Sequence, residues 1–143
     1  MHRALLLAVV LGACSSGDGD RYVGRGIAEV TPRHAPEGKR TSRAEDEEAR
    51  LRRRGDGRLE VTLDECTFTT ERAVAGRAEI APGTPCATRR ATSQAEVVVQ
   101  RGDVQIDDAA GTLSVHLEGD GRASNLGSEV DVRYVYTFSG QRQ

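Results

Sequence analysis

The stretch EVDVRYVYTF, residues 129–138, carries the clearest structural signal in this chain of 143 residues. Its alternate positions hold apolar or aromatic side chains that would share one face: Val130, Val132, Tyr134, Tyr136 and Phe138. The positions between them are mostly polar, and alternation with a period of two residues is typical of a β-strand with one buried face. We therefore expect a strand over this stretch and a sheet around it.

Two further segments repeat the alternation. One set is Leu113, Val115 and Leu117, and the other is Leu59, Val61 and Leu63. After the second set the parity changes, because the next core candidates are Cys66 and Phe68. A bulge or bend near residues 64–65 would bring both side chains back to the core face.

Shorter apolar runs and turn signals divide the rest of residues 58–143. Candidate strands are 74–80, 97–99 and a short one around Val104 and Ile106. We expect a tight hairpin at 101–103 and turns at 82–85, 108–111 and 119–121. Strands at a spacing of about 8–12 residues, without an amphipathic helix, predict an all-β domain over 58–143, either a small antiparallel β-sandwich or a barrel-like sheet.

Residues 14–57 have the composition of a disordered polar tether. Between residues 31 and 57 the chain is rich in charge, and Leu51 is its only large apolar side chain. Such a segment buries too little apolar surface to offset the entropy of ordering. Before it, an apolar island around Tyr22 and Ile27 could form a frayed edge strand.

A short charged helix is expected within this tether, over residues 42–54. Ser42 and Glu45 fit a capping box, and acidic residues in the first turn precede basic residues in the last. Glu48 and Arg52 have the i,i+4 spacing of a helical ion pair. A helix of about ten residues is marginal without packing, so we expect a transient spacer. Alternatively, the basic run 52–54 could contact anionic lipid.

The first fourteen residues have the layout of an export leader. Arg3 precedes the apolar run 4–13, which has about half the ~20 residues needed to cross a bilayer. The run ends in Leu11-Gly12-Ala13-Cys14, which resembles the lipobox of bacterial lipoproteins. In that family the cysteine sulfur receives a diacylglycerol, the leader is cut before it, and the new amino terminus is acylated.

This resemblance implies a signal peptide over 1–13 and a lipid anchor on Cys14 in a bacterial cell envelope. Several acyl chains together give stable membrane attachment. Position 15 is Ser. In lipoproteins of enteric bacteria, an Asp directly after the lipidated cysteine resembles a signal that keeps the protein in the inner membrane. Ser15 therefore favours the outer membrane.

Cys66 and Cys86 remain as an even pair once Cys14 is assigned to lipid. An exported chain meets an oxidising compartment, which favours a disulfide between them. The alternative is a metal or redox pair, but the chain has no C-x-x-C motif, and neither His34 nor His116 has ligand-like spacing to either cysteine.

Composition disfavours several functional classes. Lys and Arg total 20 against 22 Asp and Glu, so no strong positive field would attract nucleic acid. Aromatic residues make up 3% and tryptophan is absent, which disfavours a stacking platform for sugars. We predict no cofactor.

Candidate catalytic and metal-binding residues are few. His34 falls in the tether and His116 on the outer face of a strand, while the acidic pairs 107–108 and 118 with 120 fall at expected turns, where Asp is favoured structurally. Calcium at the acidic turns 18–20 or 118–120 is a milder possibility. We assign no catalytic or metal-binding residue.

The sequence thus favours a lipid-anchored envelope protein that binds or scaffolds, with an envelope protein or polysaccharide as its partner. The alternatives are an envelope hydrolase with an unrecognised site and a small-ligand carrier with a barrel lumen.

The anchor prediction has a direct test. Cys14→Ala should abolish labelling of the protein by a radioactive or clickable fatty acid and release it from the membrane fraction, because the acylated thiol is lost. Labelling that survives the substitution would contradict the lipobox interpretation.

Overall fold

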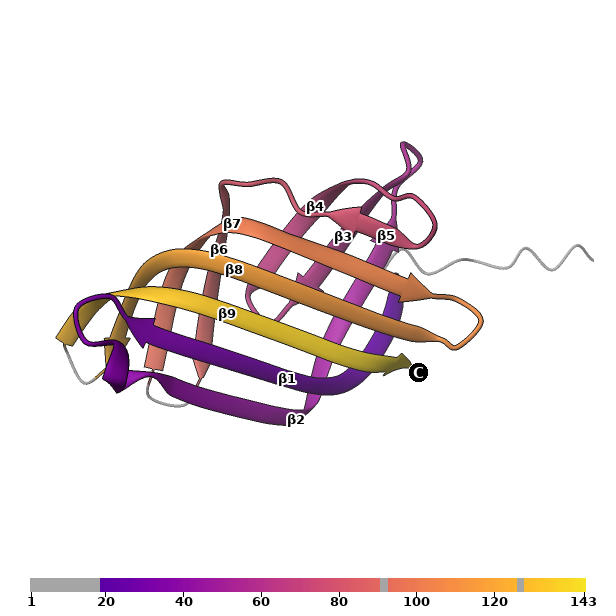
Figure 1. The fold of residues 1–143 in the computed structure, drawn as a ribbon. Coiled ribbons are helices and arrows are strands. Elements are labelled where there is room, and N and C mark those ends of the chain that lie inside the picture. The colour runs from indigo at the N-terminus through magenta and orange to yellow at the C-terminus, as the bar shows by residue number, and fades with distance from the viewer. Residues whose placement is uncertain (1–18, 91–92, 126–127) are drawn as a thin grey trace, which may run out of the picture.

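The computed structural model describes residues 19–90, 93–125 and 128–143. They form a nine-stranded antiparallel sheet (Figure 1), which confirms the predicted all-β class. The strands are β1 (Asp20–Pro32), β2 (Arg40–Arg53), β3 (Arg58–Leu63), β4 (Cys66–Arg72), β5 (Arg77–Glu79), β6 (Thr84–Arg90), β7 (Ser93–Asp107), β8 (Thr112–Asn125) and β9 (Ser128–Arg142). A single turn of 3-10 helix, η1 (Pro36–Gly38), joins β1 to β2. Among the described residues, no helix has the length and apolar character needed to cross a membrane.

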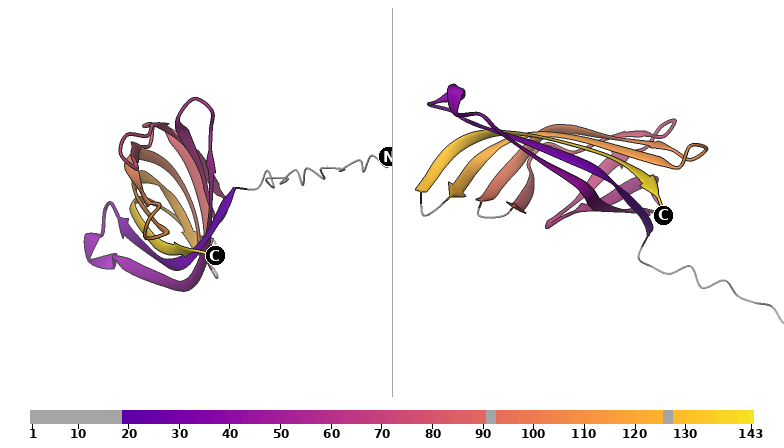
Figure 2. Two further views of the ribbon diagram at one scale, coloured as in Figure 1. Left: turned by 90° about the vertical axis from the view of Figure 1, so that its right-hand side faces the viewer. Right: turned by 90° about the horizontal axis from the view of Figure 1, so that it is seen from below.

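The sheet curls until its two edges nearly meet. Its strand order is β4-β3-β2-β1-β9-β8-β7-β5, with β6 also paired to β7. A β-bridge between Thr70 and Ile80 and the disulfide between Cys66 and Cys86 connect β4 to the β5–β6 edge. The result is one barrel-like sheet and not a two-layer sandwich, with the long strands β1, β9, β8 and β7 curving around its interior (Figure 2). The expected disulfide is therefore present, and it joins the two edges of the sheet.

The predicted strand signals are confirmed where the alternation is strong. In β9, four of the five predicted core residues are buried: Val132, Tyr134, Tyr136 and Phe138. The predicted core sets of β8 and β3 are buried as well. Cys66 and Phe68 also face the core, but the change of parity is made by the β3–β4 hairpin turn at Asp64 and not by a bulge.

The prediction of a disordered tether over 14–57 is wrong for the residues described, because β1 and β2 occupy 20–32 and 40–53. β1 is a central strand between β2 and β9 and not a frayed edge. Tyr22 is completely buried in it. The folded domain therefore includes residues from Asp20 onward.

The prediction of a helix over 42–54 is also wrong, because residues 42–53 belong to β2. Its charges pair across strands: Glu48 binds Arg21 of β1 at 2.7 Å, and Arg52 binds Glu60 of β3 at 2.7 Å. Ala49 is fully buried on the inner face, so pairing and burial in the sheet override the local helical spacing. A charge pattern alone does not distinguish the two arrangements.

Two expected turns lie inside strands. Residues 101–103 are part of β7, next to a β-bulge between Val99 and Arg101, and residues 119–121 are part of β8. Gly119 and Gly121 permit close approach of β7, since a Cβ on either would overlap backbone of that strand. The expected strand over 74–80 is reduced to β5.

The disulfide should contribute a large share of the stability. Replacing Cys66 and Cys86 by Ala should lower the free energy of unfolding by about 3 kcal/mol, because the 20-residue separation frees a loop in the unfolded chain. Urea unfolding measures the change. Adding a reductant should lower the urea midpoint of the parent protein to that of the variant. A parent midpoint that does not change with reductant would contradict a disulfide between these cysteines.

Candidate binding groove

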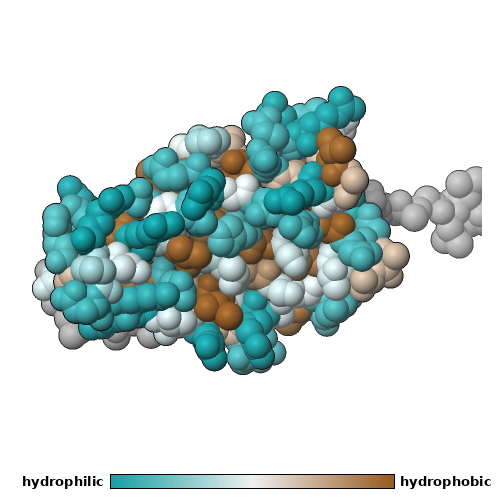
Figure 3. All heavy atoms as spheres, viewed as in Figure 1, coloured by the Kyte–Doolittle hydropathy of each residue, from teal (hydrophilic) through white to brown (hydrophobic). Residues whose placement is uncertain are grey.

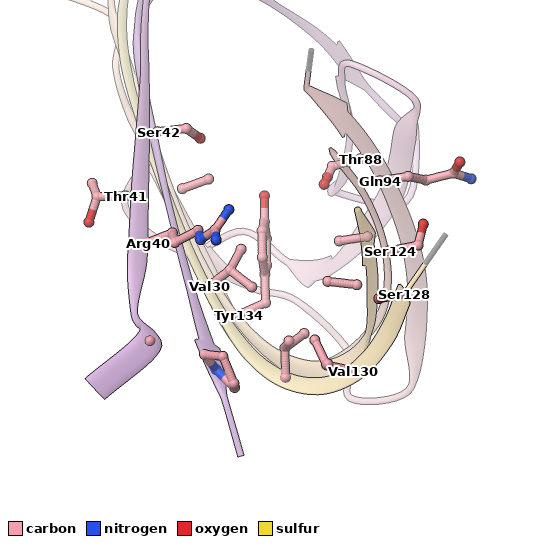
Figure 4. A pocket seen from close by; sticks show the side chains of 16 residues that line it. Val30, Arg40, Thr41, Ser42, Thr88, Gln94, Ser124, Ser128, Val130 and Tyr134 are labelled. Atoms are coloured by element: carbon pink, nitrogen blue, oxygen red, sulfur yellow. The ribbon is translucent and has the colours of Figure 1, made fainter. Parts of the chain in front are cut away.

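A groove of about 610 Å³ opens at one end of the barrel. It lies between the β1–β2 side of the curved sheet and the side formed by β6, β7 and β8, with β9 between them (Figure 4). Pro32 and Arg40 belong to this end, whereas Asp20 and the carboxyl terminus lie at the opposite end (Figure 1). We call this hollow the groove.

The opening exists because β3 is shorter than its neighbour. β3 pairs with β2 only over Ala49–Arg53 of the longer strand, and β2 begins nine residues earlier, at Arg40. Within the described part of the chain, no strand pairs with this first part of β2 on the side away from β1. The barrel wall is therefore incomplete between β2 and β6.

Small side chains keep the interior of this end empty. Ala95 of β7, Ala123 of β8 and Val130 of β9 lie side by side in the register and line the groove. Ala28 lines its β1 side. At the opposite end the inward positions carry larger side chains, such as Leu113, which fill the core. The same strands thus carry small inward side chains at one end and large ones at the other, and the space that the small side chains leave unfilled is the groove.

The floor of the groove is formed by Tyr134, which is almost completely buried. Its ring lies parallel to that of Tyr136, with 6.4 Å between the ring centroids. Glu47 of β2 and the disulfide surround the same interior region, where only about 10 Å³ is open. A Cβ at Gly26 would overlap the Glu47 carboxylate, so this glycine makes room for the acid.

Among the residues that the structure describes, Arg40 is the charged residue that lines the groove. Its side chain extends from β2 toward the Tyr134 ring, whereas Thr41 points away (Figure 4). Thr88 and Ser42 add hydroxyl groups to the lining. The groove therefore combines an aliphatic wall with one cation and a few hydroxyls.

The outer face of the long strands has a different character. It is largely hydrophilic, with separate apolar spots (Figure 3). Among the described residues, the large apolar side chains that are markedly exposed are Val74, Val98 and Val130, of which Val130 lines the groove. The groove is therefore a more continuous apolar surface than the outer face seen in this view.

The candidate residues singled out from the sequence lie elsewhere. Cys14 is outside the described residues, and His34 is exposed in the β1–β2 connection. Asp107 accepts a hydrogen bond from the backbone amide of Ala110 at 2.9 Å, as expected for a turn. Asp108 binds Arg53 and Arg142 at 2.6 and 2.8 Å, at the end opposite the groove. None of these described residues lines the groove.

Glu118 is the centre of a charge cluster on the outer face of β8. Its carboxylate accepts hydrogen bonds from Arg101 at 2.7 Å and Arg133 at 2.9 Å, and it lies 3.1 Å from the ring nitrogen Nε2 of His116. The hydrogen bond from Arg101 and those from its other neighbours lower the pKa of Glu118 to about 2. The expected outward position of His116 is confirmed, but Glu118 and Asp120 lie within a strand and not at a turn.

No group of three potential metal ligands (His, Cys, Asp or Glu) occurs in the described ranges. The groove could not be predicted from the sequence, because the segment that forms one of its walls, β1 and β2, has the composition of a tether. The available signal was the small residues Ala28, Ala95 and Ala123, whose shared inward position becomes evident only once the strand register is known.

Comparisons with protein families, with curated proteins and with solved structures find no match to this chain.

The Glu118 cluster should make stability depend on pH. Glu118→Gln should lower the free energy of unfolding at pH 7 by about 1 kcal/mol, because three charge-assisted contacts are lost and the arginines are largely exposed. The folded-state pKa is below the usual value of 4.5, so this stabilisation is present above pH 4.5 and disappears as the pH falls toward 2. Urea unfolding at several pH values measures both effects.

A matched control is Glu45→Gln, which breaks an ion pair with Arg25 in which both side chains are mostly exposed. Its effect should stay below about 0.5 kcal/mol. A Glu118→Gln penalty that is the same at pH 7 and pH 2.5 would contradict the assignment.

Proposed function

We propose that this chain is a lipid-anchored protein of the bacterial cell envelope that binds an apolar ligand in the groove. The anchor rests on the lipobox-like Leu11-Gly12-Ala13-Cys14. The binding role rests on one observation, an aliphatic groove of about 610 Å³ in an incomplete barrel wall. This volume falls within the range of about 300–1,000 Å³ that is typical of small-molecule sites.

A lipid on Cys14 would determine which end of the barrel faces the membrane. The chain from Cys14 to Asp20 can extend at most about 20 Å, so a lipid on Cys14 would hold the Asp20 end of the barrel close to the membrane. β1 then runs 13 residues, roughly 40 Å of strand, to the end where the groove opens. The groove would therefore open away from the membrane, where a ligand from the aqueous compartment can enter.

The exposure of Val130 supports a binding role. This side chain is 47% exposed although it stands on the inward face of β9 beside Ala123. Apolar surface left in contact with water costs about 25 cal/mol per Å², and a ligand in the groove would recover part of this cost. The hydroxyl groups around the wall can orient such a ligand.

An envelope protein or polysaccharide as partner, the role favoured from the sequence, stays a prediction. Two of the other roles considered from the sequence have less support. A hydrolase would need its reactive groups at a cavity, but His116 and the acidic residues at 107, 108, 118 and 120 are absent from the groove lining. Lipid contact by the basic run 52–54 is weakened by the pairing of Arg52 with Glu60 and of Arg53 with Asp108.

Filling the groove should abolish ligand binding without unfolding the protein. We expect the Cys14→Ala chain, which carries no lipid, to bind the neutral apolar dye N-phenyl-1-naphthylamine at one site with a rise in fluorescence. Adding Ala123→Phe should reduce dye binding at least tenfold, because the new ring occupies the space between Ala95 and Val130. Circular dichroism verifies that the variant is folded.

The matched control is Val98→Phe, which enlarges an exposed side chain on the outer face of β7 and should leave dye binding unchanged. Equal loss in both variants, or a parent protein that binds no dye, would contradict the proposed function.

A further inference from the structure

Arg40 lines the groove and, in the described part of the chain, has no acidic partner, unlike the nearby Lys39 and Arg33. Lys39 binds Glu29 at 2.9 Å, and Arg33 binds Asp120. Across the residues that the structure describes, no carboxylate lies within ion-pair distance of the Arg40 guanidinium. A cation that lines an aliphatic groove without a counter-charge is suited to bind an anion there.

We propose that the groove binds a single-chain amphiphile with an oxyanion head, a carboxylate or a phosphate, and that Arg40 binds this head. The inference rests on the proposed function, because it specifies the ligand of the same groove. The alkyl chain of the ligand would lie along the aliphatic wall, and the head would remain at the rim, where Arg40 is exposed to solvent.

The strand register places the two recognition elements in one site. Arg40 is opposite Val30 in β1, and Val30 is opposite Tyr134 in β9, so the three residues form one inward row across the sheet. Figure 4 shows the Arg40 side chain beside Val30 and directed toward the Tyr134 ring. The guanidinium therefore stands at the edge of the apolar wall, within reach of a head group whose chain lies in the groove.

The aliphatic lining favours an alkyl chain over a flat or bulky ligand. Ala95, Ala123 and Val130 form a row of small side chains with no aromatic ring. Tyr134 ends the groove at its floor. A guanidinium binds carboxylate and phosphate oxygens through paired hydrogen bonds, which gives the head its orientation.

Two other occupants fit less well. A lipid on Cys14 would start at the opposite end of the barrel, because the connection from Cys14 to Asp20 spans at most about 20 Å. A peptide strand could add to the open edge of β2, but that edge carries four successive acidic residues, 45–48, and charged edges oppose strand addition. A separate amphiphile is therefore the occupant that the charges favour.

The test measures displacement of N-phenyl-1-naphthylamine from the Cys14→Ala chain by dodecanoate, dodecyl phosphate and dodecanol, each below its aggregation concentration. At least one of the two anions should displace the dye more effectively than the alcohol, and the better anion identifies the head. Arg40→Gln should weaken displacement by that anion about tenfold and leave displacement by dodecanol unchanged.

Arg43→Gln is the matched control, because it removes the same charge from the same strand at a residue that does not line the groove. It should change none of the affinities. The proposal is overturned if Arg40→Gln weakens alcohol and anion equally, if Arg43→Gln has the same effect, or if an apolar extended peptide displaces the dye while the amphiphiles do not. In each of these outcomes the parent chain still binds the dye. If the proposed function itself is wrong, the parent chain does not bind the dye at all.

Discussion

Closure of the sheet edges is the constraint on which the rest of this structure depends. A curved sheet with two free edges exposes unpaired backbone groups, and here β4 is the last strand on one side. The disulfide between Cys66 and Cys86 and the bridge between Thr70 and Ile80 hold that edge against β6 and β5. With its edges held together, a chain of modest apolar content can surround a core with one sheet.

The closure is incomplete, and the incomplete part gives the molecule its candidate site. Where β3 pairs with β2, the interior is filled by large side chains such as Leu51 and Val61. Beyond the end of that pairing, small residues such as Ala95 and Ala123 line an open groove. Stability and binding are thereby assigned to different ends of the same long strands, so the groove can remain hollow while the opposite end holds the fold together.

The sequence predicts the features that depend on alternation along a single strand. It does not predict the features that depend on pairing between distant segments. The strand at 129–138, the core sets of β8 and β3 and the cysteine pair could all be predicted, because apolar spacing and cysteine number are local or compositional signals. The strands over residues 20–53 could not be predicted, because they depend on contacts between distant residues. Glu48, for example, pairs with Arg21, which is 27 positions earlier in the chain. The groove was missed for the same reason, because its walls come from strands whose register no local pattern specifies.

The central claim is that the open end of the barrel binds an apolar ligand while the closed end remains rigid. Methyl-detected NMR during titration of the Cys14→Ala chain with dodecanoate tests it most directly, since Val30, Ala123 and Val130 provide reporters in the groove. We predict chemical-shift changes confined to these methyl groups and their neighbours, with Leu59 and Val61 of the closed end unchanged. Shifts confined to the exposed Val74 and Val98, or no shifts at any methyl group, would contradict the account.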